Sequence, residues 1–99
     1  MTKADLAEAA RGVRSIIAST LFITDPNFDI WCDIKTKVFY IMTPNKGLIN
    51  ADMVAQRRIS GALESLEGDP NKRNYTKYII TRSSIVLFNE YAFIENIPL

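Results

Sequence analysis

The sequence predicts an α+β fold, a two-layer sandwich in which two helices cover one face of a mainly antiparallel sheet of four or five strands. Residues 2–24 and 51–67 repeat apolar side chains at helical spacing, whereas the segments that follow each of them alternate apolar and polar residues as strands do. Short turns between the strand-like runs predict hairpins, whose strands are antiparallel neighbours. The expected order is α-β-β-α-β-β, and the 99 residues suit a single domain spanning 1–99.

The first helix is predicted from its start signal and its apolar stripe. Thr2 followed three positions later by Asp5 resembles a capping box, in which side chains satisfy the first free amides of a helix. The stripe recurs every three or four residues and consists of Leu6, Ala10, Val13, Ile17 and Leu21. Asp25-Pro26-Asn27 then ends the helix, because proline disfavours helical geometry in the residue before it.

Two strands are expected between Phe28 and Met42. The first alternates apolar and polar residues, and 38–42 is a short β-branched and aromatic run. Residues 35–37 form the natural turn but lack the glycine or asparagine that would fix its geometry, so two registers remain open. A two-residue loop places Trp31 opposite Tyr40, and a three-residue loop places it opposite Ile41.

A second helix is predicted over about 51–67, after a turn at 43–47. Asn50 is the expected N-cap, with Asp52 in the first turn, where the helix dipole favours an anion. Gly68 and Pro70 form a strong stop signal. The apolar stripe of this helix consists of Ala51, Val54, Ala55, Ile59, Ala62, Leu63 and Leu66.

Two further strands are expected at 75–81 and 85–88. Residues 89–95 either continue the last strand or turn at Asn89-Glu90 into a fifth, and 96–99 is expected to be a tail because Pro98 lacks an amide hydrogen. Both helices are followed by Asp-Pro-Asn, at 25–27 and 69–71. We interpret this repeat as a common way to leave a helix rather than as a duplicated unit.

The composition excludes several kinds of catalytic, metal-binding and disulfide site. The chain has no histidine and a single cysteine, which excludes histidine-activated nucleophiles, imidazole metal sites and an internal disulfide. Asp29 and Asp33 share a strand face but lie about 13 Å apart, too far for a catalytic carboxylate pair. We therefore expect no enzyme, no metal and no cofactor. Cys32 shares the parity of Ile30 and Ile34 and is expected in the core.

The predicted strands carry large apolar residues at both parities, although two helices can cover only one face of the sheet. An uncovered apolar face usually marks a contact surface. We therefore expect a small protein-interaction module that self-associates and acts as a regulator, inhibitor or assembly subunit, cellular or virus-encoded, in the cytoplasm and not in a membrane. The candidate interface residues are Trp31, Tyr40, Tyr75, Tyr78, Phe88, Tyr91 and Phe93.

Nucleic-acid binding is the alternative function. The stretch 72–82 contains four cations, no acid and two tyrosines, a mixture that can neutralise phosphates and stack bases. Those cations are Lys72, Arg73, Lys77 and Arg82. Strand alternation nevertheless predicts Tyr75 and Tyr78 on opposite faces, whereas a stacking platform needs both on one face. The net charge of +1 also provides no global attraction for nucleic acid.

Overall fold

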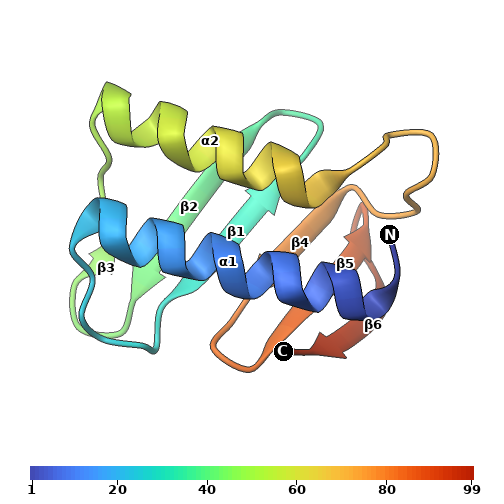
Figure 1. Ribbon diagram of the computed structural model, residues 1–99, viewed down its shortest axis with the longest axis horizontal. Helices are drawn as coiled ribbons and strands as arrows, with labels where there is room; N and C mark the ends of the chain where they lie inside the picture. The colour runs from blue at the N-terminus through green and yellow to red at the C-terminus, as the bar shows by residue number, and fades with distance from the viewer.

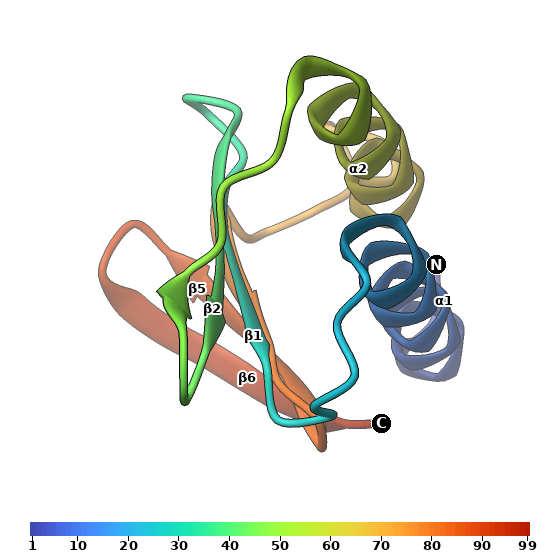
Figure 2. The ribbon, with the colours of Figure 1, turned by 90° about the vertical axis from the view of Figure 1, so that its left-hand side faces the viewer.

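Both helices lie on the same face of a six-stranded antiparallel sheet, and no element covers the other face (Figures 1 and 2). The computed structural model describes residues 1–99. Its elements are α1 (Lys3–Leu21), β1 (Asp29–Asp33), β2 (Val38–Thr43), β3 (Gly47–Leu48), α2 (Met53–Glu67), β4 (Lys77–Ile80), β5 (Ser84–Asn89) and β6 (Ala92–Pro98). The two-layer α+β class is confirmed, with six strands instead of the expected four or five.

The sheet is ordered β3-β2-β1-β4-β5-β6. Each half of the chain is one helix followed by three strands that pair in sequence, and the two halves meet where β1 pairs with β4. The expected order leaves out β3, which is only two residues long. The second alternative for residues 89–95 is confirmed, because β6 is a fifth predicted strand, but the turn lies at Glu90-Tyr91 and not at Asn89-Glu90, since Asn89 still pairs with Ala92.

The start of α1 confirms the predicted capping box. The amide of Asp5 donates to Oγ1 of Thr2, and the amide of Thr2 donates to Oδ2 of Asp5, both over 3.1 Å. The helix stops at Leu21, three residues earlier than the expected end, because Phe22 adopts the left-handed conformation with φ of 55°. The amide of Phe22 still donates to the carbonyl of Ala18, which closes the last turn.

The predicted N-cap of the second helix is wrong. Asp52, not Asn50, caps α2, since its carboxylate accepts the amide of Ala55 over 2.8 Å. The chain before it still belongs to the sheet, because the amide of Ile49 donates to the carbonyl of Ile41 over 2.8 Å. The end of the helix at Gly68 is as expected, and Gly68 has a φ of 67° that favours glycine.

The strand register settles the alternatives that the sequence left open. Trp31 lies opposite Tyr40, which is the first of the two predicted registers. The predicted tail is wrong in part, because β6 continues to Pro98 and pairs Ile97 with Ile85. Pro98 is tolerated there because β6 is an edge strand, where a missing amide need not break a ladder.

One hydrophobic core fills the space between the helices and the sheet. The helical stripes meet the helix-facing residues of the strands, and Ala10, Ile17 and Ile59 are fully buried. Arg14 closes one end of this core. Its guanidinium donates to the carbonyls of Pro26, Phe28 and Ile80, and it stacks 4.0 Å from the centre of the Phe28 ring. These contacts hold the loop after α1 against the sheet.

Candidate protein-interaction surface

The face of the sheet that no helix covers, called here the open face, is predominantly apolar. Strand alternation places Ile30 and Cys32 under the helices and Trp31 on the other side, where it is 47% exposed. Exposed apolar residues extend from β3 at one edge to β6 at the other. They are Trp31, Val38, Tyr40, Met42, Leu48, Tyr91 and Phe93.

The pairing of the strands arranges these residues in rows across the sheet. One row runs from Tyr40 through Trp31 and Ile79 to Val86. The neighbouring row consists of Val38, Asp33, Lys77, Phe88 and Phe93. The rings of Phe88 and Phe93 meet edge to face, with their centres 6.3 Å apart. Trp31 therefore lies near the middle of a continuous apolar surface.

A shallow groove of about 340 Å³ crosses this surface beside Trp31. Most of its walls are apolar, as is typical of binding sites. The only charged residues that line the groove are Asp33, Lys77 and Glu90. Its apolar lining includes Trp31, Val38, Tyr40, Ile79, Phe88 and Tyr91.

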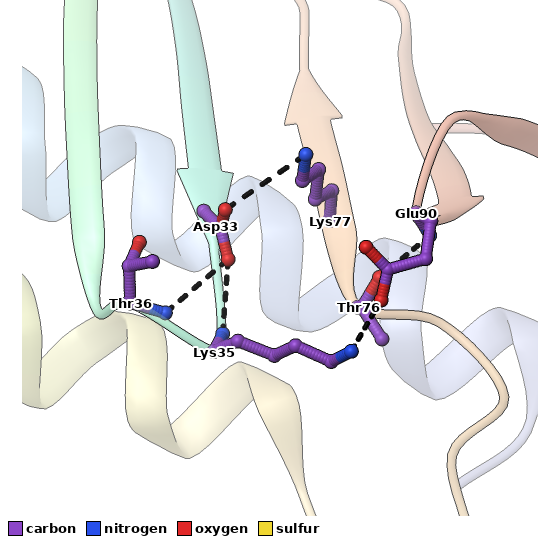
Figure 3. A network of polar contacts seen from close by, with 6 residues as sticks. All are labelled: Asp33, Lys35, Thr36, Thr76, Lys77 and Glu90. Carbon is purple, nitrogen blue, oxygen red and sulfur yellow. Dashed lines mark hydrogen bonds and ion pairs between the residues drawn. The ribbon is translucent and has the colours of Figure 1, made fainter.

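A polar network joins the two hairpin turns at the end of the groove (Figure 3). Oδ1 of Asp33 accepts the amides of Lys35 and Thr36 over 3.0 and 3.3 Å. The ammonium of Lys35 pairs with Glu90, whose own amide donates to the hydroxyl of Thr76 over 2.8 Å. The hydrogen bond from Lys35 to Glu90 raises the pKa of Lys35. The carboxylates at this end of the face are therefore already engaged within the chain.

Lys77 differs from its charged neighbours because its ammonium makes no hydrogen bond to the protein. It lies 3.9 Å from Oδ2 of Asp33 and 4.4 Å from the centre of the Tyr91 ring. The first distance is long for an ion pair, and the second is a cation–π contact. The Lys77 side chain is 30% exposed, so it can donate to a group arriving from outside.

Most of the predicted interface residues belong to the open face, but two do not. Trp31, Tyr40, Tyr91 and Phe93 are exposed on it, and Phe88 is partly exposed. The expectation that Tyr75 and Tyr78 lie there is wrong, because both are buried on the helix side of the sheet. Their rings meet edge to face, 6.2 Å between centres. Tyr75 precedes β4, so the strand alternation used to place it does not reach that far.

Five apolar members of the open face escaped the sequence prediction. Val38 and Met42 share the parity of Tyr40, so the Trp31–Tyr40 register is the signal that could have placed them. The position of Leu48 on the open face could not be predicted, because a two-residue strand is too short to show alternation of apolar and polar residues. The remaining two are Ile79 and Val86, which lie opposite each other on β4 and β5.

The candidate nucleic-acid residues are not brought together. Lys72 and Arg73 lie in the loop after α2, whereas Lys77 begins β4 and points to the open face. Arg82 lies beyond the other end of β4, where it donates to Oδ1 of Asn27 over 3.3 Å. Tyr75 and Tyr78 are buried and offer no stacking surface. The stretch 72–82 thus forms neither a continuous basic patch nor an aromatic platform.

Cys32 lies in the core, as its parity predicted. Burial is the main reason that its thiol pKa rises to about 12, so the thiol stays protonated and weakly nucleophilic at neutral pH. Its sulfur lies 3.7 Å from Oε2 of Glu67, an atom that also accepts a hydrogen bond from Tyr78. No cluster of three or more metal-ligating side chains occurs in the structure.

Comparison of the chain with models of known protein families, with curated proteins and with solved structures gave no match. Neither helix has the length and apolar character needed to cross a membrane. Functional inference therefore rests on the open face itself.

Proposed function

We propose that this protein is a non-enzymatic interaction module that self-associates by stacking the open face of one copy on that of another. The single observation that carries the proposal is the continuous apolar surface around Trp31, which no part of the chain covers. Tryptophan and tyrosine near the centre of an interface contribute a large share of binding free energy. A role as a regulator, inhibitor or assembly subunit follows if the dimer presents its helices to further partners.

The size of the open face suits a dimer. Its most exposed aromatic residues are exposed to 47% (Trp31), 53% (Tyr40), 63% (Phe93) and 92% (Tyr91). With about 200 Å² for a whole aromatic side chain, these four expose about 500 Å². The largest apolar patch of a typical monomer measures about 300–600 Å², and Val38, Met42 and Leu48 enlarge this one further. A stable interface needs about 800 Å² from each partner, so these four aromatic side chains alone provide more than half of the required area.

The charge of the open face also suits a second copy of the same chain. A strongly charged face would repel its own copy, because both copies carry the same sign at the same place. Here both signs are present, since Asp29 and Asp33 share the face with Lys77. The chain as a whole carries only +1. We further propose the cytoplasm as its compartment, because the only cysteine is a free thiol.

Light scattering coupled to size-exclusion chromatography tests this proposal. We expect a mass near twice the 11.2 kDa of one chain, retained at high salt because apolar contacts are not screened. Trp31→Ala should shift the protein toward monomer while its far-UV circular dichroism remains native. Phe22→Ala is the matched control, because Phe22 is 89% exposed but lies at the end of α1. A wild-type protein that stays monomeric at every concentration would refute self-association.

A further inference from the structure

We infer that two reciprocal contacts between Asp29 of one copy and Lys77 of the other set the orientation of the dimer. This inference rests on the proposed self-association through the open face. Two charged groups on this face have no hydrogen-bond partner. Asp29 makes no hydrogen bond or ion pair within its own chain, although its charge acts at longer range on the Arg14 guanidinium. Lys77 makes no hydrogen bond and has only the long 3.9 Å contact with Asp33 and the cation–π contact with Tyr91.

Both residues lie on the open face. Asp29 pairs with Met42, which is exposed there, whereas the next residue, Ile30, is fully buried under the helices. Lys77 lines the groove on the same side, and the residue after it, Tyr78, is fully buried. The other acidic groups near the groove are already committed, because Asp33 holds the turn amides and Glu90 holds Lys35.

The pairing of β1 with β4 places the two charges symmetrically. Trp31 lies opposite Ile79 in this antiparallel pair. Asp29 comes two residues before Trp31, and Lys77 two residues before Ile79, so the charges extend in opposite directions from the central pair. With a rise of about 3.3 Å per residue and a strand spacing of about 4.8 Å, they are about 14 Å apart.

Two such sheets can be related by a two-fold axis that lies midway between them, parallel to both, and passes over the Trp31–Ile79 pair. If this axis is perpendicular to the line that joins Asp29 and Lys77, it places each Asp29 opposite the Lys77 of the other copy. That line is inclined by about 20° to the strands, so the strands of the two sheets cross at about 40°. This angle is close to the roughly 30° of aligned sheet packing.

The same axis places Trp31 and Ile79 of both copies at the centre of the interface. Packed sheets lie about 10 Å apart, a gap that a lysine and an aspartate side chain can bridge together. An apolar surface alone would allow several sliding arrangements. Two charge pairs at fixed positions select one of them, since every other arrangement buries Asp29 without a partner and leaves Lys77 only its contacts with Asp33 and Tyr91.

Charge exchange tests this inference. Asp29→Lys creates two lysine–lysine contacts in a homodimer, and Lys77→Asp creates two aspartate–aspartate contacts. We expect each variant alone to show a dissociation constant raised about tenfold or more. In a mixed dimer of the two variants, each contact again joins a lysine to an aspartate. The mixture should therefore form a heterodimer, detected by its intermediate mass in native mass spectrometry, while each variant alone remains mainly monomeric.

The controls separate the possible failures. Glu64→Lys and Arg58→Asp change the charge equally on α2, in the opposite layer, and should leave association unchanged. If Lys77→Asp does not fold because Asp33 is adjacent, adding Asp33→Asn removes that repulsion and keeps an oxygen for the turn amides. Wild-type monomer refutes the proposed function itself. A wild-type dimer whose exchanged variants associate normally, or whose mixture fails to recover association, refutes only the Asp29–Lys77 contact.

Discussion

The hydroxyl of Tyr78 donates a hydrogen bond of 2.8 Å to Oε2 of Glu67, which joins the middle of the sheet to the last residue of α2. The thiol of Cys32 approaches the same oxygen at 3.7 Å, and the hydroxyl of Tyr75 lies 3.5 Å from the backbone carbonyl of Glu67. An anion at the C-terminal end of a helix is disfavoured by the helix dipole. These donors offset that cost and fix the end of α2 over the sheet.

Tyr78→Phe should lower the free energy of unfolding by about 2 kcal/mol. The substitution keeps the buried ring but leaves the Glu67 carboxylate without its nearest donor, and hydrogen bonds to charged groups contribute about 1.5–3 kcal/mol. Tyr91→Phe is the matched control, because the Tyr91 side chain is 92% exposed and its hydroxyl makes no hydrogen bond to the protein. Urea denaturation measures both variants, and equal stabilities would show that the Tyr78–Glu67 bond contributes nothing.

Asp52→Ala should lower the free energy of unfolding by about 1 kcal/mol, the usual cost of losing an N-cap side chain. Asn50→Ala should change it by less than about 0.5 kcal/mol, since Asn50 is exposed and caps nothing. The comparison distinguishes the observed start of α2 from the one that the sequence favoured. Thermal denaturation followed by circular dichroism is sufficient, and the opposite ranking would place the helix start at Asn50.

The elements that the sequence predicted well are those with local signals. Thr2 and Asp5 form the expected capping box, and Gly68 with Pro70 ends α2, because these motifs act within a few residues. The start of α2 was misplaced because two good capping residues lie two positions apart. The choice between them depends on a bond from Ile49 to Ile41 in the sheet, which is not local.

The geometry of the hairpin turns could not be predicted from the sequence either. Their turns place Lys37 and Glu90 in the left-handed region, with φ of 59° and 55°, where glycine or asparagine would have been the recognisable signal.

The Asp29–Lys77 arrangement could not be predicted from the sequence either. It depends on the pairing of β1 with β4, whose connection passes through β2, β3 and α2. Strand parity also gave no means of knowing which face the helices cover, so Tyr78 was assigned to the wrong one.

Arg14→Met should lower the free energy of unfolding by about 2–3 kcal/mol. Methionine keeps an apolar stem against Phe28 but cannot donate to the three backbone carbonyls that the guanidinium holds. Arg14→Lys should recover only part of the loss, because an ammonium lacks the planar fork of the guanidinium. Arg11→Met on the exposed side of α1 is the control. Full stability of Arg14→Met in denaturant titrations would show that the loop after α1 is held by other contacts.

Stability should fall as the pH rises above 9, and Cys32 should cause the first part of the fall. Burial raises the thiol pKa from its ordinary 9.0 to about 12, so the folded state keeps a proton that the unfolded state loses. The thiol contribution is therefore complete below pH 9 and declines between pH 9 and 12, by at most about 1.4 kcal/mol per pH unit. Tyr75, Tyr78 and Lys35 also have raised pKa values, but their ordinary values are 10.0 or higher.

Between pH 9 and 10, the slope of stability against pH should therefore be smaller in Cys32→Ala than in the wild type. The lost sulfur also leaves a small cavity, which lowers stability equally at every pH and does not change the slope. Urea denaturation at closely spaced pH values measures the two slopes. Equal slopes would mean that the Cys32 thiol ionises as readily in the folded protein as in the unfolded chain.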